Sequence, residues 1–386
     1  MDHKYNFDVI VIGAGPAGST AAYLLASKGF RVLILDKNTF PRDKLCGGLL
    51  TCKTVKLLES TFRITVDVLK SKQIITCSSI KYRVVSSTGS SFTSQLEYPF
   101  HFVQRTVYDS FWLKMACRAG AEFRSGEKVI SLDHFNFGGA VSTGRGSKFY
   151  GKFILGADGA ISKVRRWLAS RNFIHTGLKS NLATALEIFL PTRQTPDLPD
   201  YPQIYFGHIP WGYAWCFPGK HVRVIGICGL NAKAGRLLRN GYEAFLDSIH
   251  ISREHLPAPA SHALPYGNYL RTPGSGNVLL LGDACGLADP LLGEGIYYAH
   301  KSAQLAAEAV MQSYHEPPAV LKAYTRHLNR VIIAELKYAR IGRQIIFSLP
   351  GAWPYRVLTS LLKIMPHKCE AVIQGQRSFK WFRPLK

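Results

Sequence analysis

The sequence of 386 residues lacks any uninterrupted apolar run long enough to cross a bilayer, which takes about 20 residues. Its first apolar run, residues 7–17, is broken by Gly13, Gly15 and Pro16. That run is therefore too short for a membrane span, and it lacks the layout of a signal peptide. We expect any contact with a membrane to be peripheral.

Metal-binding patterns are also missing. The eight cysteines include no C-x-x-C pair, and no cluster of His and Cys has the spacing of zinc ligands. Scattered thiols in a long chain are typical of reduced, intracellular proteins. We therefore predict no metal site and a cytoplasmic location, with peripheral attachment to the cytoplasmic face of the membrane as an option.

Acidic residues are scarce, because 25 Asp and Glu stand against 48 Lys and Arg, for a formal net charge of +23. Such an excess favours a polyanionic partner, which could be nucleic acid, an anionic membrane surface or a phosphorylated substrate. Hydrophobic residues make up 47% of the chain, which excludes intrinsic disorder, and the length suits about two domains.

Part of the positive charge gathers near the C-terminus. Residues 331–386 carry ten Lys and Arg against Glu335 and Glu370, and aromatic and aliphatic residues are interleaved with them. This mixture fits a helix lying in an anionic membrane interface, and it equally fits a solvated helical cap with a disordered tail. No recognised nucleic-acid-binding module accompanies the charge, so we do not expect a nucleic-acid partner.

The chain opens with a β-branched run at residues 7–12, an Ala- and Leu-rich segment at 19–28 and a second β-prone run at 31–35. This order predicts a strand, a helix and a second strand. We therefore expect a βαβ unit to open the chain.

The turn inside this unit carries the spacing G-x-G-x-x-G at Gly13, Gly15 and Gly18. Such glycines allow the turn, the approach of a pyrophosphate and close packing of helix on strand. Asp36 ends the second strand, where a carboxylate can accept a hydrogen bond from a ribose 2′-hydroxyl. Because Asp36 would repel a 2′-phosphate, we expect FAD or NAD rather than NADP.

Two later strand ends distinguish FAD from NAD. Residues 149–155 lead into Gly156-Ala-Asp158-Gly159, and residues 277–282 lead into Asp283. A carboxylate at such a strand end can hold a ribityl hydroxyl or a water bound to the pyrophosphate, which a simple NAD domain does not need. The pattern therefore favours FAD.

Together these motifs resemble the p-hydroxybenzoate-hydroxylase-type flavoprotein fold. Three segments are similar to the geranylgeranyl reductase family: residues 40–49 (FPRDKLCGGL), 212–218 (GYAWCFP) and 282–296 (GDACGLADPLLGEGI). The resemblance spans about residues 5–310. It implies an FAD-dependent enzyme that reduces isolated double bonds of polyprenyl chains.

The motifs and the resemblance together predict the residues that contact FAD. Residues 290–296 read as a glycine-rich turn opening a helix, whose N-terminus would stabilise negative charge on the reduced flavin. Glu294 either assists there or is an ordinary carboxylate at a helix start. The predicted cofactor-binding residues are Gly13, Gly15, Ala17, Gly18, Asp36, Lys37, Cys46, Gly47, Arg105, Asp158, Gly282, Asp283, Gly293, Gly295 and Ile296.

Three residues are candidates for catalysis. The resemblance implies that Cys46 lies near the active site, although a small buried apolar role is an equal alternative. Tyr213 and Trp215 alternate with Phe217 on a predicted strand and share one face, which suits a long apolar substrate. By itself such a row of aromatic side chains is more typical of a protein core. The resemblance to the family favours a surface that faces the substrate instead. Cys46, Tyr213 or a trapped water could supply a proton to the alkene.

The cationic pair Arg42 and Lys44 reads either as solvated charge or as a diphosphate site. The substrate predicted from the resemblance is a polyprenyl lipid or a polyprenyl diphosphate. Because only one dinucleotide fingerprint is present, NAD(P)H would visit transiently or a ferredoxin-like protein would reduce the flavin. The alternatives are a flavin-dependent monooxygenase or halogenase, and a non-catalytic, membrane-attached flavoprotein.

For the whole chain we predict an α/β fold in which a Rossmann-like FAD-binding domain is interrupted by a β-rich substrate domain and followed by a helical region. Two short β-prone runs, residues 73–79 and 80–86, belong to the insertion. The expected boundaries are 1–70, 100–170 and 270–320 for the FAD-binding domain, 71–99 and 171–269 for the substrate domain, and 321–386 for the helical C-terminal region.

Overall fold

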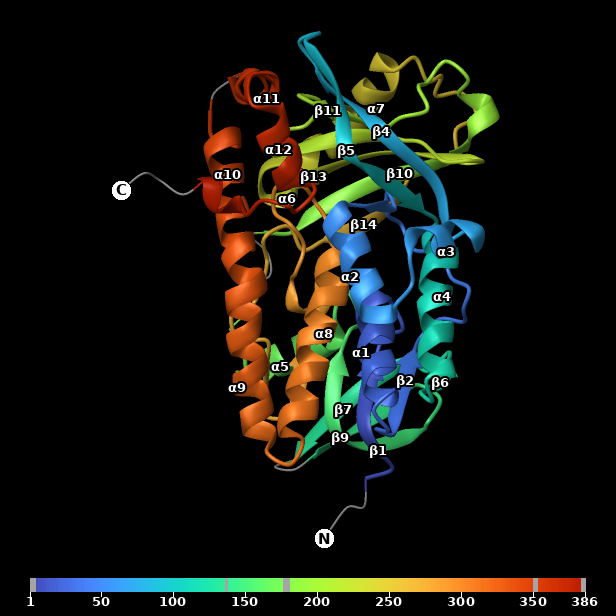
Figure 1. Cartoon of the computed structure of the whole chain (residues 1–386), viewed down its shortest axis with the longest axis vertical. Coiled ribbons are helices and arrows are strands. Elements are labelled where there is room, and N and C mark those ends of the chain that lie inside the picture. Colours follow the sequence, from blue (N-terminus) through green and yellow to red (C-terminus); the bar gives the residue numbers. More distant parts are fainter. Residues whose placement is uncertain (1–4, 136–137, 176–180, 350–352, 383–386) are drawn as a thin grey trace.

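The computed structural model describes residues 5–135, 138–175, 181–349 and 353–382. Its described strands form two sheets, one at each end of the molecule in Figure 1. The first sheet has the strand order β15-β16-β9-β1-β2-β6, and β7 and β8 extend it through β9. Its strands are β1 Phe7–Ile12, β2 Val32–Asp36, β6 Glu122–Ser125, β7 Val129–Phe135, β8 Gly138–Thr143, β9 Lys148–Gly156, β15 Gly274–Ser275 and β16 Val278–Leu280.

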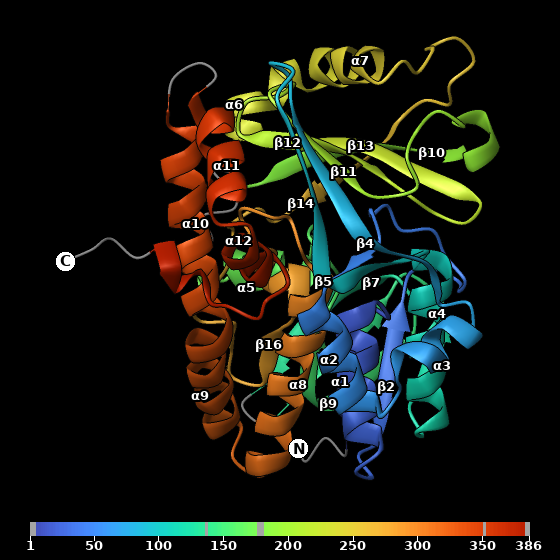
Figure 2. The same cartoon turned by 45° about the horizontal axis from the view of Figure 1, so that its top comes forward.

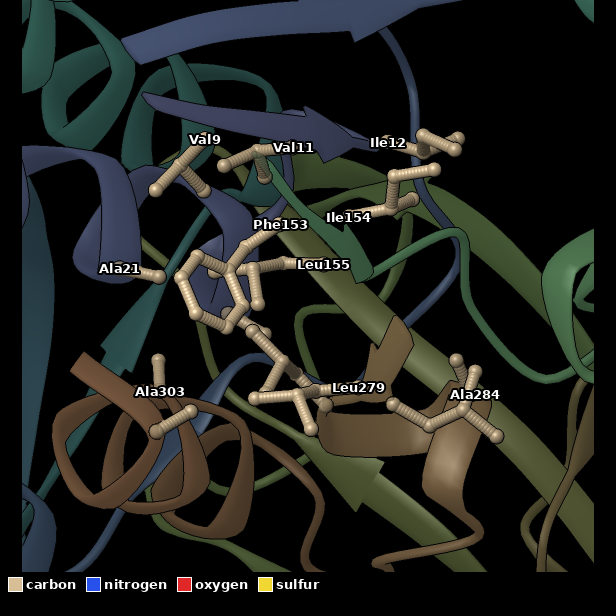
Figure 3. Close-up of a cluster of buried hydrophobic side chains, with 14 of the residues drawn as sticks. Val9, Val11, Ile12, Ala21, Phe153, Ile154, Leu155, Leu279, Ala284 and Ala303 are labelled. Atoms are coloured by element: carbon tan, nitrogen blue, oxygen red, sulfur yellow. The ribbon is translucent and has the colours of Figure 1, made fainter. Parts of the chain in front are cut away.

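The centre of this sheet is parallel, because β1 pairs in parallel with β2 on one side and with β9 on the other. Its residues are a nearly continuous apolar run, as expected for strands covered on both faces. Figure 3 shows Val9, Val11, Phe153 and Leu155 packed together, with Ala303 of helix α8 (Ile296–Ser313) on the helix side. Burying each large side chain contributes about 1.5–3 kcal/mol, so this cluster is a main source of stability.

The first strand matches its predicted bounds, whereas the helix that follows begins earlier than expected. Helix α1 spans Pro16–Ala26 instead of residues 19–28. Proline suits the first helical position, because its missing N–H would have no partner there in any case. The glycine-rich turn is thereby shortened, and a Cβ at Gly18 would overlap the main-chain oxygen of Gly13.

The second sheet has the order β14-β10-β13-β12-β11-β4-β5-β3. Instead of two short strands at 73–79 and 80–86, the chain forms the single strand β4, whose pairing shifts register between Ser79 and Lys81. The Ser79 hydroxyl accepts from Lys81 N and donates to Lys81 O, so the irregularity is bridged without ending the strand. The strands are β3 Leu49–Leu50, β4 Ile75–Ser86, β5 Ser91–Val103, β10 Ala183–Pro191, β11 Gln203–Phe206, β12 Gly212–Phe217, β13 Val222–Leu230 and β14 Ala260–Leu264.

Helices cover both sheets. Helices α1, α4 and α8 lie against the first sheet, α2 packs on α8 and on β5 of the second sheet, and α7 packs on the outer face of the second sheet (Figures 1 and 2). The helices not yet given bounds are α2 Cys52–Phe62, α3 Val66–Ser71, α4 Arg105–Arg118, α5 Lys163–Ser170, α6 Asn231–Ala234, α7 Leu238–Ser248, α9 Pro317–Leu328, α10 Ala334–Phe347, α11 Trp353–Ile364 and α12 Pro366–Ile373.

The basic C-terminal segment is helical and largely packed. The guanidinium of Arg343 on α10 is buried and donates to the main-chain oxygen of Tyr266 over 2.7 Å. Leu362 of α11 is buried in a cluster with Phe217 of the second sheet. Among the described residues no helix is long and apolar enough to cross a membrane. Residues 350–352 and 383–386 of this segment lie outside the described residues.

Candidate active site

A cavity of about 770 Å³ lies where the two sheets meet. Loops at the carboxyl ends of β1, β2 and β9 line one side, and β14 of the second sheet lines another. In open α/β sheets ligands bind at this edge of the strands. Most of the predicted cofactor residues line the cavity: Gly13, Gly15, Ala17, Asp36, Lys37, Cys46, Arg105, Asp158, Asp283, Gly293, Gly295 and Ile296.

The three other predicted residues lie directly behind this lining. Gly18 packs against Gly13, and Gly282 donates its N–H to Ser302 Oγ over 2.9 Å. Gly47 follows Cys46 and lies under the ring of Phe217. The fold therefore collects fifteen positions, spread between residues 13 and 296, around one cavity.

The glycine-rich turn fits a pyrophosphate. Gly13 has φ of 103°, and a Cβ there would overlap the main-chain oxygen of Ala157. A Cβ at Gly15 would lie 3.4 Å from the Arg42 guanidinium, and α1 begins at once with no side-chain cap. Free helix N–H groups, a bare backbone and an arginine are the donor set that FAD requires at this position.

Asp36 holds the turn in place. Its Oδ2 accepts from Ala14 N over 2.8 Å and its Oδ1 accepts from Asn38 N over 2.9 Å. The residue is buried but still lines the cavity. A carboxylate oxygen has a second lone pair, so a bond from a ribose hydroxyl remains compatible with these contacts.

Asp109 was not predicted from the sequence, and it anchors two of the arginines that line the cavity. Its buried carboxylate accepts from Arg105 Nε over 2.7 Å and from Arg105 Nη2 over 2.9 Å, and Arg42 Nη2 lies 3.0 Å away. Burial opposes the charge of Arg105, but Asp109 raises the pKa of that guanidinium well above its usual value. The i, i+4 spacing from Arg105 to Asp109 was the available sequence signal.

The two strand-end acids have different partners. Asp158 accepts from Ser162 Oγ and from Lys163 N, each over 2.6 Å, and so caps α5. Burial raises the pKa of Asp283, while Lys44 and Arg105 act to lower it. The chain at Gly295 passes close to Asp283, since a Cβ there would lie 3.3 Å from Asp283 Oδ1.

The loop before α8 is fixed by two buried acids. Asp289 Oδ1 accepts from Leu291 N over 2.7 Å and from Leu292 N over 2.8 Å. Glu294 turns toward α2, where Lys53 Nζ lies 2.6 Å from its Oε2 and Thr51 donates to its Oε1. Of the two readings of Glu294, this favours a structural carboxylate, and Gly295 is left to open the N-terminus of α8 with no side-chain cap.

Cys46 faces the cavity, and the aromatic stripe lies behind it. A Cβ at Gly47 would lie 2.7 Å from the Phe217 ring and 3.6 Å from Trp215 Nε1. Trp215 and Phe217 belong to a buried cluster, and Tyr213 donates to the main-chain oxygen of Leu292. Tyr213 and Trp215 thus support the Cys46 and α8 loops and are absent from the cavity lining.

A buried acid of the second sheet was also not predicted from the sequence. Glu187 of β10 is 1% exposed, and its Oε2 lies 3.7 Å from His262 Nδ1. His262 of β14 lines the cavity. No motif contains either residue, so only the strand register brings them together.

Comparisons with known proteins agree with this arrangement. Residues 6–187 match the FAD binding domain family. The chain is 32% identical over 319 residues to a geranylgeranyl diphosphate reductase of Rhodobacter capsulatus, covering 79% of this chain and 75% of that protein. It is 26% identical over 321 residues to a digeranylgeranylglycerophospholipid reductase of Methanosarcina acetivorans, covering 80% and 75%.

Solved structures share the fold. A geranylgeranyl bacteriochlorophyll reductase-like protein of Thermoplasma acidophilum superposes with a TM-score of 0.77 at 21% identity, covering 89% of this chain and 88% of that one. The halogenase PltM in complex with phloroglucinol and FAD gives 0.71 at 18% identity, covering 97% and 85%. The fold and FAD as cofactor are thereby confirmed. The chain belongs to the geranylgeranyl reductase family of FAD-dependent oxidoreductases.

Proposed function

We propose that the protein saturates C=C bonds of a polyprenyl lipid or polyprenyl diphosphate. The observation that carries this proposal is the cavity of about 770 Å³ beside the predicted FAD residues, because apolar side chains such as Leu45, Leu264 and Ile296 also line it and suit a substrate with few groups to hydrogen-bond. The names of the two reductases at 32% and 26% identity support the same substrate class.

When bound, FAD in its reduced form supplies the hydride for one alkene carbon. The chain must hold the substrate, exclude water and deliver a proton to the other carbon, because an isolated alkene is a poor hydride acceptor. Tyr213 already donates its hydroxyl to Leu292 over 2.6 Å, so it is a poorer candidate for the acid than Cys46 or a trapped water.

The electron donor follows from the single dinucleotide fingerprint at Gly13, Gly15 and Gly18. We propose that FAD occupies this site permanently. NAD(P)H would then visit the flavin transiently, or a ferredoxin-like protein would reduce it.

The deciding experiment incubates dithionite-reduced enzyme with a geranylgeranyl lipid in the absence of oxygen. A product that gains two hydrogens per double bond supports reduction. Turnover that appears only with oxygen would favour a monooxygenase or halogenase, for which the shared fold with PltM is the specific observation. If reduced FAD is reoxidised equally fast with and without any polyprenyl compound, the protein is a non-catalytic flavoprotein.

We further propose that the C-terminal helices contact an anionic membrane surface. Trp353 and Ile364, at the two ends of α11, are 58% and 75% exposed. Arg356 lies 5.9 Å from the centre of the Trp353 ring, and Lys363 precedes Ile364. Exposed apolar residues beside cations are typical of a helix at a membrane interface.

A further inference from the structure

The second sheet places a buried acid beside the cavity. Glu187 of β10 pairs with Gly226 of β13, and Gly226 pairs with Trp215 of β12. Residues directly opposite one another in antiparallel strands point to the same face. A Cβ at Gly226 would lie 2.5 Å from the Trp215 ring and 2.8 Å from Glu187 Cγ. Glycine at this position therefore lets the Glu187 side chain lie next to the ring that supports the Cys46 loop.

His262 connects this acid to the cavity. On β14, His262 pairs with Ala185, two residues before Glu187, so both side chains lie on one face. The His262 side chain is 13% exposed and lines the cavity, whereas the Glu187 side chain behind it is 1% exposed. His262 therefore lies between the buried Glu187 side chain and the cavity.

Neither residue has another partner for the atoms that face each other. Glu187 Oε2 and His262 Nδ1 are both buried, lie 3.7 Å apart and make no hydrogen bond within the part of the chain that the structure describes. Within the same residues, no Lys or Arg lies within ion-pair distance of Glu187. A buried carboxyl group without a cationic partner is costly to ionise, which favours a retained proton.

The groups around Glu187 come from α4, β13, α7 and β14 and from the loop that carries Lys44. Burial raises the pKa of Glu187 to about 7, while Lys44 and Arg105 act to lower it. The other neighbours are Cys228 of β13 and Tyr242 of α7, and burial raises the pKa of each thiol or phenol so that both are uncharged at neutral pH. Burial lowers the pKa of His262 to about 3, so this ring is neutral as well.

We propose that Glu187 and His262 are the route by which a proton reaches the substrate alkene, with His262 as the catalytic donor and Glu187 as the positioning acid that replenishes it. The proposal rests on the proposed function, since it supplies the acid that alkene reduction needs. Neither Glu187 nor His262 belongs to a sequence motif.

The step balances in atoms and charge. The alkene π bond gives its electron pair to the proton leaving His262 Nε2, and the other carbon receives the hydride. His262 Nδ1 takes the proton of Glu187, so the ring ends neutral and its tautomer is exchanged. Glu187 is left as a carboxylate, whose charge Lys44 and Arg105 stabilise, and it regains a proton from solvent between turnovers.

The test uses the FAD-loaded enzyme and the variants Glu187→Gln and His262→Gln. Anaerobic stopped-flow measurements follow flavin reoxidation by a geranylgeranyl lipid after dithionite reduction. In the unchanged protein the rate should fall as the pH rises through about 7, where Glu187 ionises. Both variants should lose about 10²–10⁴-fold in rate, and Glu187→Gln should also lose this pH dependence.

Infrared spectroscopy of the oxidised enzyme gives a readout independent of turnover. A protonated carboxyl band should be present at pH 6, disappear near pH 7 and be absent from Glu187→Gln, yet remain in His262→Gln. A Glu187 band that titrates near the ordinary pKa of 4.5 would overturn the proposal. Unchanged rate and pH dependence in Glu187→Gln, or an unchanged rate in His262→Gln, would overturn it as well.

A matched control is Glu370→Gln. Glu370 is another buried carboxyl group, but it accepts from Tyr82 and Ser94 and lies away from the cavity lining. Its variant should keep the rate and the pH profile. If Glu187→Gln loses FAD, Glu187→Asp replaces it, and a slowed reaction that still falls near neutral pH supports the proposal. If no polyprenyl compound reoxidises the unchanged enzyme, the proposed function fails, while the infrared titration still decides whether Glu187 stores a proton.

Discussion

The hydroxyl of Tyr213 donates to the main-chain oxygen of Leu292 over 2.6 Å, and this bond ties the second sheet to the loop that opens α8. A Cβ at Gly293 would lie 2.5 Å from the same hydroxyl. This contact therefore fixes the position of β12 relative to the loop before α8, and it makes Tyr213 a structural residue.

Tyr213→Phe should lower the free energy of unfolding by about 1–3 kcal/mol, because the Leu292 carbonyl loses its donor. We expect alkene reduction to stay within about tenfold of the unchanged rate. Denaturant unfolding and anaerobic single turnovers measure the two quantities. A loss of about 10²-fold or more at normal FAD content would instead make Tyr213 the proton donor.

Asp109→Asn should weaken FAD binding and destabilise the fold by about 3–5 kcal/mol, because it leaves two arginines in the cavity wall without their shared carboxylate. Bound FAD per chain and thermal unfolding are the measurements. Asp133→Asn is the control, since Asp133 is half exposed and its pair with Lys148 contributes at most about 1 kcal/mol. Equal effects of the two variants would contradict this role of Asp109.

Glu187 should also make stability depend on pH. Its pKa in the folded state is raised to about 7 from the ordinary value near 4.5, so the folded state favours the protonated form. The free energy of unfolding should therefore fall by about 3 kcal/mol as the pH rises from 4.5 to 7. Glu187→Gln should remove most of this fall. Denaturant titrations across the range test it, and an unchanged slope would show that other groups cause the dependence.

Substitution of Trp215 tests whether the aromatic residues of β12 serve lipid reduction or only form part of the protein core. Trp215→Ala should weaken lipid turnover and leave the FAD content nearly intact, although removing a buried Trp costs about 3–5 kcal/mol. Trp215→Phe should retain most of the turnover. Loss of FAD from both variants would assign Trp215 to the core.

Contact with a membrane is tested by flotation with vesicles. Replacing Trp353 and Ile364 by Ser should reduce binding to anionic vesicles, and added salt should weaken binding of the unchanged protein. Ile130→Ser is the control, because this residue is 57% exposed but lies on β7 of the first sheet. Point variants are preferable to truncation at residue 331, since α10 is part of the packed core. Equal binding to zwitterionic and anionic vesicles would show that the positive charge does not serve to bind anionic lipid.

Local patterns predicted much of this protein. Residues 7–12 form β1 as expected, since a β-branched run bounded by a Gly turn has few alternatives. Asp36 ends β2, and Cys46 and Arg105 line the cavity, because short motifs set the spacing between such residues. The sequence pattern was wrong at β4, where it predicted two strands. The Ser79 side chain bridges the irregularity there, so the strand continues.

The sequence by itself determined the βαβ start, the cofactor class and the family, because each depends on short motifs whose own residues lie close together in the chain. Tertiary structure alone decided which acids meet which partners. Asp109 binds Arg42, Glu294 turns to Lys53, and Glu187 meets His262 across 75 positions of chain. The antiparallel register of β10 and β14 within the second sheet sets that last pairing, and this register depends on which face of each strand is buried rather than on the spacing of residues along the chain.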